Sequence, residues 1–196
     1  MRKRIRELNS REYEHPFDKT TLEKLEAIPV LPKIIKKLYE KSFERIDRLQ
    51  NTGSYLKINN DNLQKVYSLY SEACAILDIE KIPDLFISFD PRINGYTSGV
   101  EKPFIVLTSG AIDLLDDDEL MFLIGHELGH IKARHVLYTV MAQNFSLVAN
   151  LLGNLTFGIG GVAATGVEIA LLHWYRMSEL SCDRAGLLTC QSKKAA

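Results

Sequence analysis

The sequence has few cysteines, almost no net charge and no apolar leader at its start. Cys74, Cys182 and Cys190 are odd in number and lack C-x-x-C spacing, which argues against a disulfide framework. The formal net charge of -1 gives no overall attraction to nucleic acid, so no nucleic-acid partner is expected. The basic residues at the start lead into polar residues, which does not fit a signal peptide. We therefore expect a cytoplasmic protein with reduced thiols.

The composition is that of one globular unit. The chain has 196 residues, of which 46% are hydrophobic and 25% charged, and it carries no repeat or low-complexity tract. We expect residues 1–59 to form an N-terminal helical arm that packs as one unit with a main domain at residues 60–196. Because the last residues still have a helical pattern, we also expect this domain to be truncated at its C-terminus.

The order of the periodic segments predicts an α+β fold that is mainly helical. Alternating apolar residues predict strands at residues 83–90 and 104–108, after a short extended segment at residues 55–58. Asn94, Gly95 and Tyr96, between the two strands, predict a turn or bulge. Helical spacing and caps predict helices near residues 20–27, 33–50, 60–77, 111–115, 117–142 and 167–189.

Residues 136–167 contain no charged side chain. The segment is long enough to cross a bilayer once, but a single crossing would separate the residues on either side of it. Its asparagines and glycines also fit poorly with a lipid-exposed span. The pattern favours a buried or surface-lying helical hairpin broken near residues 158–161, with membrane association through residues 136–167 as the alternative.

The strongest motif is H-E-x-x-H, formed by His126, Glu127 and His130 inside the predicted helix at residues 117–142. Histidines four residues apart lie on one helix face, where both can bind one metal ion. From the next position the carboxylate of Glu127 can reach a water in an open coordination position. The spacing therefore predicts a hydrolytic zinc site, with one Zn²⁺ per chain.

The sequence around the motif supports a helix with a close neighbour. Asp116 is placed to cap the helix, and Glu119 is placed to complete a capping box. Gly125 and Gly129 each weaken a helix by about 1 kcal/mol relative to alanine. We therefore expect something to pack closely against these glycines, either a strand or the residues around the metal.

A hydrolytic zinc site commonly has three protein ligands, so the two histidines need a third donor. Glu179 is the candidate. Asp183, four residues later on the same predicted helix face, could then accept a hydrogen bond from the far ring N–H of a ligating histidine. Without the H-E-x-x-H motif, Glu179 and Asp183 would be interpreted as ordinary solvated acids paired with Arg176 and Arg184.

Two separated motifs, together with Asn94-Gly95-Tyr96, carry a resemblance to a known family. The segments at residues 125–135 (GHELGHIKARH) and 178–185 (SELSCDRA) resemble those of metallopeptidase family forty-eight, the HtpX-like and CAAX prenyl endopeptidase group. The resemblance covers roughly residues 60–190. The family often has alanine and phenylalanine after the asparagine, where this chain has Gly95 and Tyr96.

The resemblance implies a zincin-like core, with a small β-sheet beside the H-E-x-x-H helix, and a role for each motif residue. It implies that His126, His130 and Glu179 bind zinc and that Glu127 is the catalytic base. Asp183 is then the residue that supports a ligating histidine. These roles give residues 60–196 the expected character of a zinc metallopeptidase domain.

The expected activity is hydrolysis of internal peptide bonds in unfolded or extended protein substrates. We expect the strand at residues 104–108 to be the sheet edge on which a substrate pairs, so that Phe104, Ile105 and Val106, together with Asn94, bind substrate. The alternative is a catalytically silent, zinc-dependent module that binds proteins, as a chaperone does. A purely structural metal is disfavoured because no fourth protein donor is well placed.

Four other residues have chemistry of interest, but each is better explained by packing. His135 is expected to be a core or surface histidine rather than a fourth ligand, and His173 is expected to point away from the metal. Packing also explains Cys182 better than thiolate ligation, and Tyr175 on an apolar helix is expected in the core.

Overall fold

The computed structural model describes residues 2–27, 53–143, 145 and 160–196. The predicted helix at residues 33–50 lies outside the described residues, as do residues 144 and 146–159 of the uncharged segment at residues 136–167. Within these ranges, none of the helices combines the length and the apolarity that a bilayer crossing requires.

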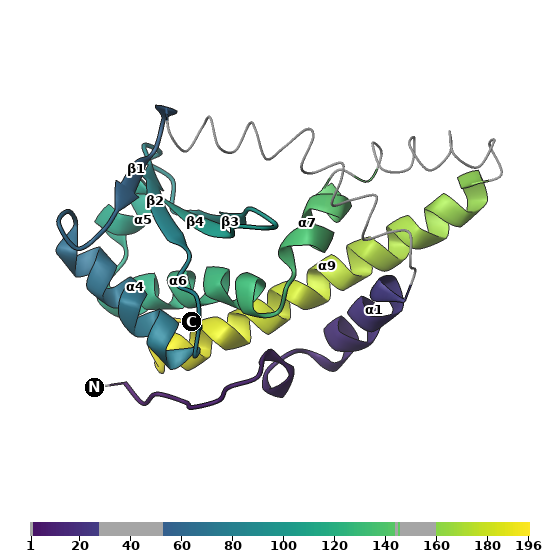
Figure 1. The fold of residues 1–196 in the computed structure, drawn as a ribbon, viewed down its shortest axis with the longest axis horizontal. Helices are drawn as coiled ribbons and strands as arrows, with labels where there is room; N and C mark the ends of the chain where they lie inside the picture. Colours follow the sequence, from purple (N-terminus) through teal and green to yellow (C-terminus); the bar gives the residue numbers. More distant parts are fainter. Residues whose placement is uncertain (1, 28–52, 144, 146–159) are drawn as a thin grey trace.

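The described elements form an α+β fold that is mainly helical, as predicted (Figure 1). In chain order they are a 3₁₀ turn at Ser10–Glu12, α1 (Pro16–Glu26), β1 (Leu56–Ile58), α4 (Gln64–Ile76), β2 (Asp84–Ser88), β3 (Gly95–Ser98), β4 (Phe104–Thr108), α5 (Ser109–Leu114), α6 (Asp117–Lys132), α7 (Val136–Gln143) and α9 (Gly160–Cys190).

The four strands form one mixed sheet in the order β1-β2-β4-β3. β2 and β4 are the two predicted strands, and they pair in parallel, while β1 and β3 pair antiparallel at the two sides. The prediction of a turn at Asn94–Tyr96 is wrong for its last two residues, since β3 begins at Gly95. The prediction that residues 104–108 form a sheet edge is also wrong, because β4 lies between β2 and β3 and is buried along its whole length.

Helix α6 lies between the sheet and α9, and α4 covers one end of this pair of helices (Figure 1). The core between them is apolar. It contains Leu107 of the sheet, Ile124 and Leu128 of α6, and Tyr70 of α4, all fully buried. This packing fixes α6 from both sides, so its H-E-x-x-H motif has a defined position relative to β3 and α9.

Helix α6 begins as predicted but ends earlier. The Asp116 carboxylate accepts hydrogen bonds from the first-turn amides, and the Glu119 carboxylate accepts one from the Asp116 amide, which completes the capping box. The helix ends at Lys132 because Arg134 adopts the left-handed conformation, with φ of 59°. The continuous helix predicted at residues 117–142 is therefore two helices, α6 and α7.

The two glycines of α6 allow α9 to pack very close to it. A Cβ atom at Gly125 would lie 1.8 Å from Oγ1 of Thr189, and one at Gly129 would lie 2.9 Å from Cβ of Ala185. Close packing at these glycines was predicted, but the neighbour is a helix, not a strand. This contact is what brings the second ligand motif next to the first.

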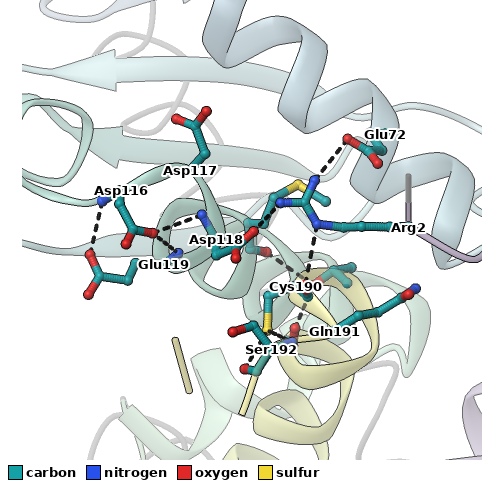
Figure 2. Close-up of polar contacts among 12 residues, drawn as sticks. Arg2, Glu72, Asp116, Asp117, Asp118, Glu119, Cys190, Gln191 and Ser192 are labelled. Atoms are coloured by element: carbon teal, nitrogen blue, oxygen red, sulfur yellow. Dashed lines mark hydrogen bonds and ion pairs between the residues drawn. The ribbon is translucent and has the colours of Figure 1, made fainter. Parts of the chain in front are cut away.

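The N-terminal segment runs along the side of α9 that faces away from the sheet, and its first residues lie beside the C-terminal end of α9 (Figure 1). Figure 2 shows its anchor, where the Arg2 guanidinium pairs with Glu72 of α4 and Asp118 of α6 and donates to the carbonyl of Cys190. Next to it, Gln191 exchanges two hydrogen bonds with the backbone of Lys3. The first residues of the chain thus connect α6, which carries the H-E-x-x-H motif, with α4 and α9.

Candidate metal centre

Three side chains with metal-binding atoms converge between α6 and α9. His126 and His130 come from the buried part of α6, and Glu179 comes from the facing turn of α9. Nε2 of His126 lies 3.3 Å from one Glu179 carboxylate oxygen, and Nε2 of His130 lies 3.7 Å from the other. The three ligand atoms lie within 4.8 Å of one another, which is a separation that a single cation can bridge.

Asp183 supports this arrangement from the next turn of α9. Its carboxylate lies 3.0 Å from Nδ1 of His126, the ring nitrogen that does not face Glu179. When Nδ1 carries the proton and its N–H donates a hydrogen bond to Asp183, Nε2 has a free lone pair that points toward Glu179. The sequence predicted this pairing from the four-residue spacing of Glu179 and Asp183, but not which histidine Asp183 contacts.

Glu127 lies beside the ligands, with 6% of its surface exposed. The hydroxyl of Thr97 on β3 donates to the Glu127 carboxylate at 2.7 Å and lies 3.0 Å from the Glu127 carbonyl oxygen. Burial, supported by the negative charge of Glu179, raises the pKa of Glu127, while His126 and Thr97 oppose this shift. A carboxylate with a raised pKa is a better proton acceptor for general-base catalysis.

The pKa values of the two histidines shift in opposite directions because their surroundings differ. Burial, followed by the neighbouring His135 and His126, lowers the pKa of His130 to about 3, so this imidazole is neutral at pH 7. Burial lowers the pKa of His126 as well, but Glu179, Glu127 and Asp183 outweigh burial and the net shift is upward. A cation that binds His126 must therefore compete with a proton, and this competition becomes stronger as the pH falls.

The carboxylate of Glu179 is held in its charged form. Burial raises its pKa, but the hydrogen bond with His126, the charges of His130 and His126, and a hydrogen bond from Tyr175 lower it more. A charged carboxylate facing two imidazole nitrogens is the donor set that Zn²⁺ prefers in hydrolytic sites. The residues present therefore fit zinc.

A cleft of about 430 Å³ opens directly over these residues. Its lining combines the candidate ligands with residues of β3, including Asn94 just before the strand and Thr97 within it. Tyr175 was expected in the core, but it also lines this cleft. The candidate metal ligands therefore lie in the wall of an open cleft.

The structure brings most of the predicted site residues together but leaves out three. His126, Glu127, His130, Glu179, Asp183 and Asn94 all line the cleft. Phe104, Ile105 and Val106 are buried in the interior strand β4 and do not line it, because both edges of β4 are already paired. No further strand can pair with β4. The strand that lines the cleft is β3.

The four residues assigned to packing lie in different surroundings. His135 and Cys182 are both fully buried, with Sγ of Cys182 3.6 Å from Nδ1 of His135, behind the candidate ligands. His173 is exposed and stacks edge-on against Phe17 of α1, away from the cleft.

Thr97 was not predicted as a site residue, because its role comes from a strand pairing that has no local sequence signal.

Comparison with known protein families gives a match for most of the chain. The model of the family described as peptidase family M48 matches residues 60–196. This range contains every residue of the candidate metal centre, and the match confirms the resemblance inferred from the two motifs. No solved structure matches the chain.

Curated relatives carry peptidase names. The chain is 37% identical over 192 residues to the Arabidopsis thaliana protein named Plastoglobule-localized metallopeptidase 48, chloroplastic; the match covers 97% of this chain and 54% of the relative. It is 29% identical over 118 residues to the Protease HtpX homolog of Helicobacter pylori, covering 58% of this chain and 38% of that protein. The chain thus spans about half the length of the first relative and less of the second.

Proposed function

The chain belongs to peptidase family M48, and from this premise we propose that it is a zinc metalloendopeptidase that cuts internal bonds of unfolded or extended protein segments. The single observation that carries the proposal is the convergence of His126, His130 and Glu179, from two helices, beside the buried carboxylate of Glu127 and an open cleft. Members of a family can lose activity, so the proposal rests on this geometry as much as on the similarity.

In this proposal His126, His130 and Glu179 hold one Zn²⁺ per chain, and Asp183 orients His126. When bound, the cation would polarise the scissile carbonyl and lower the pKa of a coordinated water towards about 7. With three protein ligands that line the cleft, a bound cation would have room for a water. The same count argues against a purely structural zinc, which would have four protein ligands.

Glu127 acts as the general base. It takes a proton from the attacking water and later gives it to the leaving amine. Its burial and raised pKa favour this exchange, and the hydrogen bond from Thr97 keeps the carboxylate turned toward the cleft.

The substrate binds along β3, the outer strand of the sheet beside the cleft. Pairing through the main chain suits extended segments of many sequences, because it makes few demands on side chains. Within β3 the Thr97 side chain points to Glu127, while the neighbouring Tyr96 donates to the hydroxyl of Tyr55 on the other side. The substrate's scissile bond would then lie over Glu127, with Asn94 near one end of the paired segment.

Replacement of Glu127 by glutamine tests this function. Glu127→Gln removes the base but keeps the side-chain volume, so we expect zinc content to stay at one per chain while casein cleavage falls by at least about 100-fold. Glu101→Gln, an exposed residue outside the cleft, is the matched control and should cut normally. Cleavage by Glu127→Gln at the wild-type rate would refute the assigned base. Zinc-loaded wild type that binds unfolded casein without cutting it would instead favour a silent binding module.

A further inference from the structure

A buried carboxylate lies on the opposite side of the α6–α9 contact from the cleft. Asp18, on α1, has no exposed surface, although it comes from an N-terminal segment outside the part of the chain that matches the family. A buried charge is costly unless several donors surround it. The groups around Asp18 therefore indicate what this residue does.

Three donors from other parts of the chain face the Asp18 carboxylate. Nε1 of Trp174 donates to one oxygen at 2.8 Å, and the Ser181 hydroxyl donates to the other. Ser181 in turn accepts a hydrogen bond from the backbone amide of His15, which fixes the start of α1 on α9. Nε2 of His135 lies 3.1 Å from the second oxygen, although its N–H does not point straight at it.

His135 connects this carboxylate to the candidate metal centre. It lies in the connection between α6 and α7, fully buried, and its ring packs edge-on against the ring of His130 with 5.5 Å between centroids. The other nitrogen of His135, Nδ1, lies 3.6 Å from the thiol sulfur of Cys182. The His135 ring thus has a close polar neighbour at each nitrogen.

His130 depends on this neighbour. Its Nε2 faces Glu179, while its Nδ1 is buried and has no hydrogen-bond partner. Ligating histidines are usually oriented by a hydrogen bond to their second nitrogen, as Asp183 does for His126. For His130, the ring of His135 packs against the imidazole instead.

We propose that Asp18 is a positioning residue for the metal centre: it fixes the His135 ring, which in turn holds His130 in the orientation that binds the cation. The proposal rests on the proposed function, because it takes His130 as a zinc ligand. In this proposal the N-terminal segment contributes a residue that supports the metal centre of the peptidase domain.

Asp18→Asn tests this in the full chain, because an amide nitrogen would face donors that need an acceptor. Measured by competition with a coloured chelator, zinc affinity should fall by about tenfold or more, and the visible spectrum of the cobalt-substituted protein should change. Ser181→Ala is the control, since it removes one donor to Asp18 and keeps both the Asp18 carboxylate and the rings that pack against His135. It should lower the melting temperature without changing zinc affinity or the cobalt spectrum.

A second variant keeps the proposal testable if Asp18→Asn does not fold. His135→Gln keeps an amide donor for Asp18 but removes the ring beside His130, so zinc affinity should again fall by about tenfold. If both single variants fold, the double variant Asp18→Asn/His135→Gln should have the same zinc affinity as the single variant that binds zinc less tightly. The two losses should not add, because both substitutions act through one contact.

Two results separate this proposal from the proposed function. Zinc affinities of Asp18→Asn and His135→Gln equal to that of wild type would overturn the positioning role and leave the peptidase intact. Failure of the wild-type protein itself to bind zinc would overturn the proposed function first.

Discussion

Two carboxylate–histidine clusters lie on opposite sides of the α6–α9 contact, and they differ in donor balance. In the cleft, Glu179 and Asp183 are 36% and 48% exposed at the side chain and face His126 and His130. Behind it, Asp18 is fully buried and surrounded by donors. The cleft cluster has more acceptors than donors, which suits a cation, whereas both oxygens of the Asp18 carboxylate already receive hydrogen bonds from the protein.

Proximity alone does not distinguish the two kinds of site. His130, His135 and Cys182 also place three potential ligand atoms within 4.8 Å of one another. Burial raises the pKa of the Cys182 thiol well above its usual range, so it stays protonated, and both nitrogens of His135 already face partners. The comparison indicates that a metal site is recognised by solvent-accessible acceptor atoms that lack hydrogen-bond donors. A group of residues of metal-binding types is not sufficient.

The largest effect is expected where the two helices touch. Gly125→Val would place a side chain against Thr189 and push α9 away from α6, which separates Glu179 from the histidines. We expect casein cleavage to fall by at least about 100-fold, with a loss of about 1–3 kcal/mol in unfolding free energy.

Gly166→Ala, on the same α9, is the matched control for this substitution. A Cβ there meets nothing within 4 Å, so the change should be neutral or stabilise the helix by up to about 1 kcal/mol. Activity retained by Gly125→Val would contradict the idea that close helix packing assembles the site.

Acid should affect the Asp18 cluster in a predictable direction. Burial raises the pKa of Asp18, but His135, Ser181 and Trp174 outweigh it and the net shift is downward. A carboxyl whose folded pKa lies below its unfolded value of about 3.9 stabilises the fold above that pH, and this stabilisation is lost as the pH falls through the folded pKa.

We therefore expect the difference in melting temperature between wild type and Asp18→Asn to be largest near pH 6 and to shrink below about pH 4. Thermal unfolding at several pH values measures it, with Trp174→Phe as the reference for a change that leaves the carboxyl in place. A difference that grows toward low pH would contradict the assigned direction.

Loss of the Thr97 hydroxyl should have a smaller effect on the cleft. Thr97→Val keeps the shape of the side chain but removes the hydrogen bond to Glu127, which is worth about 1.5–3 kcal/mol for a charged acceptor. We expect kcat for casein to fall about tenfold with KM unchanged. Thr97→Ser, which keeps the hydroxyl, should restore most of the rate, and equal loss in both variants would count against this role.

The smallest effect is expected far from both clusters, at the start of α6. Asp116→Ala removes the side-chain cap of two helix amides and should cost about 1 kcal/mol of unfolding free energy. Urea unfolding measures this loss, and the zinc affinity should be unchanged. A large loss of zinc affinity would mean that the helix start, not its contact with α9, sets the site.

Local sequence signals were enough to predict the parts of the site that depend on one helix. The four-residue spacings of His126 with His130 and of Glu179 with Asp183 place each pair on one face without any knowledge of the fold. The capping box at Asp116 is equally local, and it predicted the start of α6 at the right residue.

The rest could not be predicted because it depends on contacts between distant segments. β3 is only four residues long and becomes a strand by pairing with β4, so Thr97 gave no signal. The end of α6 at Lys132 is set by Arg134, which adopts a left-handed conformation without a glycine or proline to mark it. The role of Asp18 needs three donors that lie far along the chain.

The most direct test of the central claim is a zinc titration of Glu179→Ala and Asp183→Ala beside the wild-type chain. The account predicts one tightly bound zinc per wild-type chain, near-complete loss of that zinc in Glu179→Ala, and weakening by about 10- to 100-fold in Asp183→Ala. Wild-type zinc affinity in Glu179→Ala would show that α9 supplies no ligand and would contradict the metal centre described here.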